Sequence, residues 1–141
     1  MTEPLSNDFD WVSARAECSA SKVFRQLELQ VKTDVEKRNI LRTDNEKSKY
    51  LFECASGGRQ FSVFLTSHVV ETEDIGVTFS RTPQGIDVHS LKGELLFSGT
   101  VTLSNDRECR VKVSGMEYNS WQFRNLTLQD VFFNKVAKWR P

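Results

Sequence analysis

The sequence has few of the residues that build metal centres, disulfide frameworks or redox motifs. Its 141 residues include three cysteines and two histidines, and no two cysteines form a Cys-x-x-Cys pair. An odd number of widely spaced cysteines (Cys18, Cys54 and Cys109) predicts neither a disulfide framework nor a zinc site. We therefore expect three reduced, buried thiols, no metal ion and no cofactor.

An excess of charge of one sign and long apolar runs are also missing. The 19 Lys and Arg residues balance the 19 Asp and Glu residues, so no net field draws nucleic acid or an anionic membrane toward the molecule. No apolar stretch reaches the length of about 18 residues that spans a bilayer. The polar start Met1–Asp10 has no apolar run of the secretory kind. These features predict a soluble cytoplasmic protein with no nucleic-acid partner and no membrane partner.

The chain also lacks internal repeats and low-complexity segments. A chain of this length buries roughly two thirds of its unfolded surface on folding, which is enough for one substantial core. We interpret the polar stretch Arg42–Lys49 as a connection within a domain and not as a linker between domains. The sequence therefore predicts a single domain over residues 1–141.

One long segment near the N-terminus has the spacing of an amphipathic helix. Ser19 can accept a hydrogen bond from a free main-chain N–H as an N-cap, and we expect the helix to end near Asn39. Its apolar residues recur at helical spacing on one stripe. They are Ala20, Val23, Phe24, Leu27, Val31 and Val35.

A second helix is predicted at the C-terminal end. Thr127 and Asp130 resemble a capping box, with Asp in place of Glu or Gln. A broad apolar face follows, formed by Leu128, Val131, Phe132, Val136 and Trp139. Trp121 and Phe123 fit either an earlier turn of this helix or a strand.

Period-two alternation predicts strands on both sides of the first helix. Trp11–Cys18 alternates small apolar residues with polar ones, which indicates a strand with one buried face. Six strands follow between Tyr50 and Val113, with turns at Gly57-Gly58, Thr82–Gly85 and Asn105-Asp106. The sequence thus predicts an α+β fold, in which one antiparallel sheet of about seven strands packs against a helix from the N-terminal half and a C-terminal helix.

The order strand, helix, six strands, helix resembles the START-like helix-grip superfamily. The segment from Val12 to Phe24 (VSARAECSASKVF) is similar to the first strand of that superfamily, which runs into a cap of small residues and an apolar helix. The resemblance covers nearly the whole chain and implies a curved antiparallel sheet that wraps a long C-terminal helix around a cavity. A cystatin-like or other helix-on-sheet roll would bury the same residues, and a fold alone does not establish an activity.

No residue pair in the sequence defines a reaction. A Cys–His pair is the sharpest enzymatic hypothesis, but Cys54 and Cys109 are in phase with apolar residues, where cysteine usually acts as a small hydrophobe. His68 and His89 lie near strand ends or turns, where exposed histidines are ordinary. The acidic run Glu71–Asp74 fits a solvated turn better than a cation site. We therefore assign no catalytic residue and favour a noncatalytic role.

Aromatic residues provide the first candidate site. Five side chains can point between the sheet and the C-terminal helix: Phe61, Phe79, Phe97, Phe132 and Trp139. Such rings either interlock as core or line an apolar pocket, and dense interiors favour the core interpretation. The pocket interpretation predicts a noncatalytic binding domain that holds a small apolar ligand between sheet and helix.

Three further apolar residues provide the second candidate site. Leu51, Phe64 and Leu96 are out of phase with the inward residues of their strands, so we expect them on the other face of the sheet. A contiguous patch there would suit a protein partner or a second copy of the chain in a homodimer. Isolated surface residues are an equally good interpretation. The alternative function is therefore an interaction module that acts through the outer face of the sheet.

Overall fold

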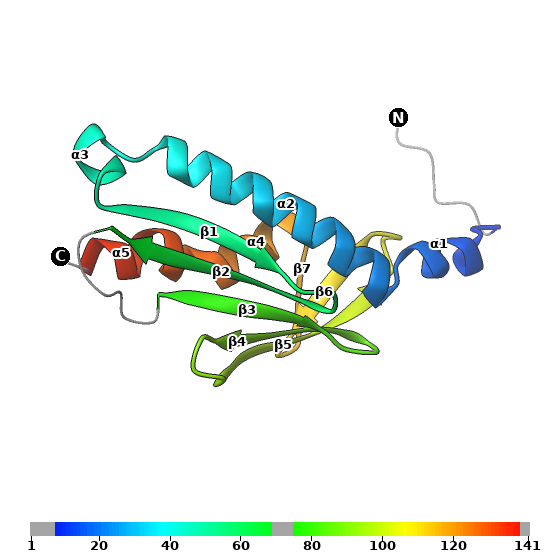
Figure 1. The fold of residues 1–141 in the computed structure, drawn as a ribbon. Coiled ribbons are helices and arrows are strands. Elements are labelled where there is room, and N and C mark those ends of the chain that lie inside the picture. Colours follow the sequence, from blue (N-terminus) through cyan, green and yellow to red (C-terminus); the bar gives the residue numbers. More distant parts are fainter. Residues whose placement is uncertain (1–7, 69–74, 139–141) are drawn as a thin grey trace, which may run out of the picture.

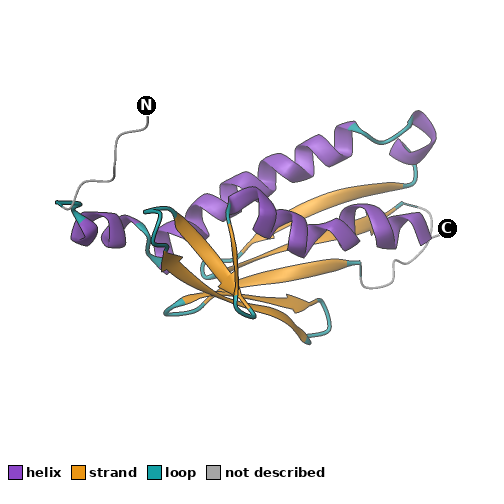
Figure 2. Ribbon diagram, turned by 180° about the vertical axis from the view of Figure 1, so that it is seen from behind, coloured by secondary structure: helices purple, strands orange, loops and turns teal. Residues whose placement is uncertain are grey.

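The computed structural model describes residues 8–68 and 75–138 (Figure 1). Seven consecutive strands form one antiparallel sheet in the order β1 to β7, each paired with the next along the chain. Helix α2 (Ala20–Ile40) and the C-terminal helical segments cover the same face of this sheet (Figure 2). The predicted α+β class, with two helices packed on a single antiparallel sheet, is confirmed.

The elements follow one another in a simple order. The strands are β1 (Tyr50–Ser56), β2 (Gln60–Ser67), β3 (Gly76–Arg81), β4 (Gly85–Ser90), β5 (Leu95–Leu103), β6 (Cys109–Val113) and β7 (Met116–Tyr118). The helical segments are α1 (Trp11–Glu17), α2, α3 (Asp44–Lys47), α4 (Ser120–Gln129), the π-helical η1 (Asp130–Asn134) and α5 (Lys135–Lys138).

The hairpins form at the predicted turn residues. Gly58 has a φ of 72° between β1 and β2, a region that glycine enters without steric cost. The main-chain N–H of Thr82 donates to the carbonyl of Gly85 at 2.9 Å and closes the turn between β3 and β4. The turn at Asn105-Asp106 lies between β5 and β6, as predicted.

The predicted strand at Trp11–Cys18 is wrong. Residues Trp11–Glu17 form α1, and the Asp10 carboxylate caps this helix by accepting from the main-chain N–H of Ser13 at 3.1 Å. None of the α1 residues is buried, so the alternation that suggested a strand does not correspond to a buried face. The seventh strand is instead β7.

Helix α2 forms as predicted and ends at Ile40. The Ser19 hydroxyl accepts from the main-chain N–H of Lys22 at 3.2 Å, which confirms the N-cap. The predicted stripe packs against the sheet, and its buried members are Phe24, Leu27, Val31 and Val35. Helical spacing carries this stripe on to Arg38, a charged residue that is only 8% exposed.

The C-terminal helix begins earlier than the predicted cap at Thr127. Asn119 and Gln122 form the capping box: each side-chain oxygen accepts from the main-chain N–H of the other residue at 3.0 Å. Trp121 and Phe123 therefore lie in α4 and not in a strand. Thr127 is buried inside the helix, and its hydroxyl donates to the carbonyl of Phe123 at 2.9 Å.

The core lies between the sheet and the two covering helices. The rings of Phe61 and Phe79 stack with their centroids 4.7 Å apart. Phe24 from α2 approaches Phe61 at 5.2 Å, and Phe123 from α4 approaches Phe79 at 6.5 Å. Since Phe61 and Phe79 are at most 1% exposed, the structure places both rings in packed core.

A disulfide bond joins Cys18 to Cys109, so the prediction of reduced thiols is wrong for these two residues. The bond connects Cys18, the C-cap of α1 just before α2, to the first residue of β6, across 91 residues of sequence. Cys54 is a free cysteine that packs against the core from a partly buried position. Burial raises the pKa of its thiol, because desolvation disfavours the thiolate.

Candidate functional site: a groove between two helices

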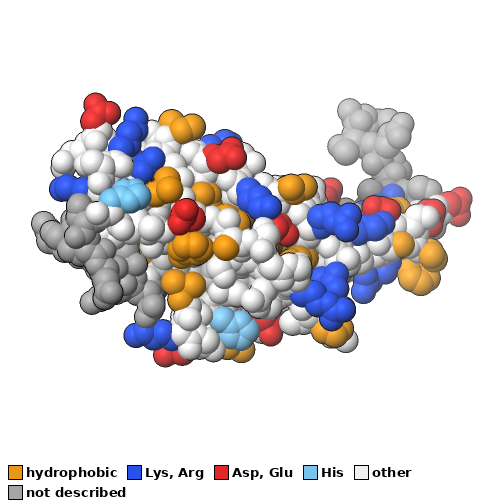
Figure 3. All heavy atoms as spheres, in the orientation of Figure 1, with side chains coloured by type: hydrophobic (Ala, Val, Ile, Leu, Met, Phe, Trp, Pro, Cys, Tyr) orange, Lys and Arg blue, Asp and Glu red, His pale blue; other side chains and the backbone are white. Residues whose placement is uncertain are grey.

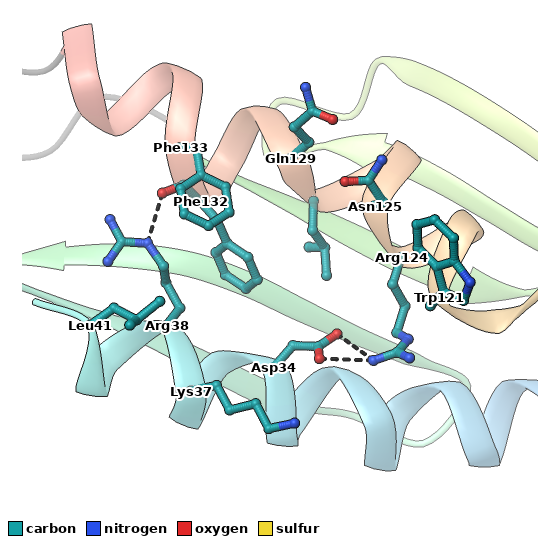
Figure 4. A pocket seen from close by; sticks show the side chains of 11 residues that line it. Asp34, Lys37, Arg38, Leu41, Trp121, Arg124, Asn125, Gln129, Phe132 and Phe133 are labelled. Atoms are coloured by element: carbon teal, nitrogen blue, oxygen red, sulfur yellow. Dashed lines mark hydrogen bonds and ion pairs between the residues drawn. The ribbon is translucent and has the colours of Figure 1, made fainter.

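A groove of about 400 Å³ lies between α2 and the C-terminal helix (Figure 4). Leu128 and Phe132, both almost fully buried, form its apolar floor. Leu41, Trp121 and Phe133 border it with side chains that are more than half exposed. Its polar lining consists of Asp34, Lys37, Arg38, Arg124, Asn125 and Gln129.

Arg38 connects three elements at one end of the groove. Its Nε donates to the main-chain carbonyl of Phe132 at 2.9 Å, and its Nη2 donates to the Tyr50 hydroxyl at 3.4 Å. The guanidinium carbon lies 5.2 Å from the ring centroid of Phe52 and 5.3 Å from that of Phe133. Arg38 therefore links α2 to β1 and to η1, and its charge is held between aromatic rings.

Tyr50 extends this contact to a carboxylate in α3. Its hydroxyl donates to Glu46 while it accepts from Arg38. The hydrogen bond from Tyr50 is the main reason that the pKa of Glu46 falls from 4.5 to about 2, because a donor stabilises the charged carboxylate. Burial and the bond to Glu46 raise the pKa of Tyr50. The chain Arg38–Tyr50–Glu46 thus places a negative charge close to the buried guanidinium.

The C-terminal helix widens into the π-helical segment η1 at this contact. The main-chain N–H of Lys135 donates to the carbonyl of Asp130, five residues earlier. Phe132 turns inward and meets Phe52 edge-on, with ring centroids 5.2 Å apart, whereas Phe133 is 53% exposed beside Arg38. Single π-helical turns of this kind occur often at functional sites.

An ion pair joins the two helices at the other end of the groove. Nη1 of Arg124 lies 2.8 Å from each carboxylate oxygen of Asp34, as Figure 4 shows. Both side chains are partly buried, at 19% and 24% exposure, so solvent screens the pair only in part. Nε of Arg124 reaches the carbonyl of Ser120 in the same helix at 3.4 Å.

The lining of the groove combines apolar, amide and charged side chains. It contains no cysteine, serine, threonine or histidine that could serve as a nucleophile or a general base. Its single carboxylate, Asp34, is held by Arg124. Three cationic side chains and one anionic side chain line the groove, so its surface is on balance positive.

The structure separates the four predicted ligand-binding residues that it describes. Phe61 and Phe79 are packed in the core, and Phe132 lines the groove between the helices. Phe97 lines a second open hollow, of about 490 Å³, between β5, β7 and α4. Trp139 lies outside the described residues. The rings that are described therefore do not surround one common pocket.

Sequence reasoning missed the charged residues of the groove. Asp34, Arg38 and Arg124 occupy helical positions that a search for apolar residues passes over. One signal was available, because Arg38 lies three residues beyond Val35 and so continues the apolar stripe of α2. A charged residue at a stripe position indicates a buried polar contact.

The predicted interface residues are only partly brought together. Leu51 pairs with Thr66 across β1 and β2, which makes Phe64, two residues from Thr66, a diagonal neighbour of Leu51 on one sheet face. Leu96 is 42% exposed and lies on β5, with β3 and β4 between it and Phe64. Figure 3 shows hydrophobic side chains on the side of the sheet that faces away from the C-terminal helix.

The other candidate sites remain apart from the groove. His68 and His89 are not among the residues that line it, and the acidic run 71–74 lies outside the described residues. Within residues 8–68 and 75–138, no three side chains of His, Cys, Asp or Glu are grouped so that they could hold a metal ion. In the same part of the chain, no helix has the length and apolar character needed to cross a bilayer.

Searches against known protein families, curated proteins and solved structures give no match to this chain.

Proposed function

We propose that this protein is a noncatalytic binding domain that holds a small ligand with an apolar body in the groove between α2 and the C-terminal helix. The observation that carries the proposal is an apolar floor, Leu128 and Phe132, between two exposed rings, Trp121 and Phe133. The volume of about 400 Å³ falls within the usual range for small-molecule sites. The proposal moves the site from the sheet–helix interior to the helix–helix groove, because the stacked rings of Phe61 and Phe79 occupy that interior.

The START-like helix-grip relationship stays a proposal of the same kind. The succession of antiparallel strands followed by a C-terminal helix supports it. The helix α1, in the place of that superfamily's first strand, is a departure from it.

The cytoplasmic location likewise stays a prediction from the sequence. The Cys18–Cys109 bond weighs against it, because disulfides form and persist mainly in oxidising compartments. Measurement of the thiol content of protein isolated from its native cells would decide between a cytoplasmic location and an oxidising compartment.

Uptake of Nile red, a neutral dye whose emission depends on its surroundings, tests the groove. We expect the folded wild type to take up the dye and Trp121→Glu to weaken uptake by about tenfold, because a charge in an apolar site is costly. Trp11→Glu is a matched control, since Trp11 is 64% exposed in α1 and Trp121 is 60% exposed in α4. Absence of uptake by the wild type, or equal loss in both variants, would refute the proposal.

A second candidate function is self-association through the outer face of the sheet. Leu51 and Phe64 are neighbours on that face, and Leu91 lies over Gly76, where an added Cβ would come within 2.9 Å of its Cδ1. This group of apolar side chains would suit a two-fold contact with a second copy of the chain.

Sedimentation of Phe64→Glu tests this second candidate. We expect the variant to shift the solution mass from dimer toward monomer, because a charge buried at the centre of a contact has no partner. Thr33→Glu, at an exposed position of α2 on the opposite side of the sheet, controls for the added charge. A wild type that remains monomeric at every concentration would rule out the homodimer.

A further inference from the structure

Each cationic side chain of the groove has a donor that no described residue occupies. Lys37 makes no ion pair or side-chain hydrogen bond within residues 8–68 and 75–138. Arg38 uses Nε and Nη2 and keeps Nη1, whereas Arg124 uses Nε and Nη1 and keeps Nη2. Since no buried side-chain nitrogen of the described chain lacks a partner, these remaining donors reach solvent.

The charged acceptors of the groove are, in contrast, already used. Asp34 supplies the only carboxylate of the lining, and both of its oxygens accept from Nη1 of Arg124. Glu46, the nearest acid to Arg38 described above, is bonded to Tyr50 and does not line the groove. The charged side chains of the groove therefore have donors without a partner and no carboxylate without one. Such a lining matches a ligand that brings negative charge and acceptor oxygens.

Lys37 is the cation of the lining that the protein itself engages least. It lies three residues after Asp34 and four before Leu41, the C-cap of α2, so these three residues lie along one side of the helix and its end. Arg124 compensates the charge of Asp34, and aromatic rings enclose the guanidinium of Arg38. The ammonium group of Lys37, by comparison, has no partner in the described chain. Its side chain lines the groove next to Asp34 and extends along α2, away from Phe132 (Figure 4), so a ligand on the apolar floor would meet it at the α2 edge of the groove.

We infer that the ligand of this groove is an anionic amphiphile, in which an apolar body lies on Leu128 and Phe132 and a single carboxylate is bound by Lys37. The inference rests on the proposed binding function and adds the charge and the head group of the ligand to it. The groove should therefore distinguish between molecules that share one apolar chain and differ only in their head group.

Displacement of Nile red by three ligands with the same ten-carbon chain tests this selectivity: decanoate, decan-1-ol and decyltrimethylammonium. We expect decanoate to displace the dye from the wild type at a concentration about tenfold lower than decan-1-ol, since one good ionic contact is worth about that factor. Decyltrimethylammonium should be the weakest competitor. Added salt should weaken the displacement of the dye by decanoate and leave displacement by decan-1-ol unchanged.

Lys37→Glu provides the residue-level test. We expect this variant to weaken displacement of the dye by decanoate by at least about tenfold, because an attraction is lost and a repulsion is added. Displacement by decan-1-ol should not change. Lys37→Arg should retain most of the preference for decanoate. Lys112→Glu is the matched control, because Lys112 is exposed on β6, does not line the groove and undergoes the same change of charge.

The outcomes separate the two proposals. Equal displacement by decanoate and decan-1-ol, or a Lys37→Glu variant that keeps the preference for decanoate, would overturn the anionic ligand and leave the groove as an apolar site. If Nile red does not bind, or if none of the three ligands displaces it, both proposals fall. Urea unfolding of each variant establishes that the protein compared is folded.

Discussion

Nε of Arg38 donates a hydrogen bond to the main-chain carbonyl of Phe132 at 2.9 Å, across 94 residues of sequence. The contact joins the last buried position of α2 to the π-helical turn of the C-terminal helix. The same guanidinium lies near the rings of Phe52 and Phe133. One polar side chain thus links the two helices that form the groove.

Replacement of Arg38 by methionine should lower the free energy of unfolding by roughly 1 to 3 kcal/mol, because it leaves the buried acceptor at Phe132 without a donor. Urea unfolding measures the loss. Arg25→Met, at an exposed position of the same helix, should change stability by less than about 0.5 kcal/mol. Equal effects of the two substitutions would show that the Arg38 contact contributes nothing.

Two leucines of α2 test the assignment of its buried face. Leu27 is 4% exposed and Leu29 is 61% exposed. Leu27→Ala should cost roughly 2 to 5 kcal/mol through lost burial and a residual cavity, whereas Leu29→Ala should cost less than about 0.5 kcal/mol. Denaturant unfolding of both variants decides the matter, and a Leu27→Ala loss as small as that of Leu29→Ala would place Leu27 at the surface.

The disulfide should contribute strongly to stability because it closes a long loop. Cys18 and Cys109 are 91 residues apart, and loop-closure entropy predicts a loss of about 4 to 5 kcal/mol when both are replaced by alanine. Reduction of the wild type should have the same effect when unfolding is followed with and without reductant. Cys54→Ala should leave the response to reductant intact. A wild type whose stability does not change with reductant would contradict the presence of the disulfide bond.

Stability should fall in acid as Glu46 is protonated. Its pKa is depressed from 4.5 to about 2 in the folded protein, so its contribution is present above pH 4.5 and is lost as the pH falls toward 2. Tyr50→Phe removes the main cause of the depression and should flatten the dependence of stability on pH in this window. Urea midpoints at several pH values measure the slopes. Tyr118→Phe is the control, and a Tyr50→Phe slope equal to that of the wild type would contradict the assignment.

The parts of the fold that the sequence could predict depend on local patterns. The apolar stripe of α2 needs only a regular spacing and the Ser19 cap. The hairpin at Gly57-Gly58 needs only a residue that tolerates a positive φ, which Gly58 supplies. These signals lie within a few residues of the structure they specify.

The parts that could not be predicted are either short or dependent on distant contacts. Helix α1 has seven residues and none is buried, so the order of its apolar and polar residues does not reflect a buried face. Strand β7 has three residues, too few for an alternation to be recognised. The partner of Cys18 and the partner of Arg38 lie in distant parts of the chain, and no spacing rule identifies them.

The order of the strands in the sheet has a consequence for the order of folding. Every strand pairs with its neighbour along the chain, so the sheet can assemble through short loops at a small entropic cost. The two helices of the groove are joined by Asp34–Arg124 and Arg38–Phe132, contacts that span 90 and 94 residues. A chain in which the sheet has formed and the last helix has not yet docked therefore has no groove. A molecule that binds there would bind only the fully docked state and, by mass action, would favour that state over the partly folded one.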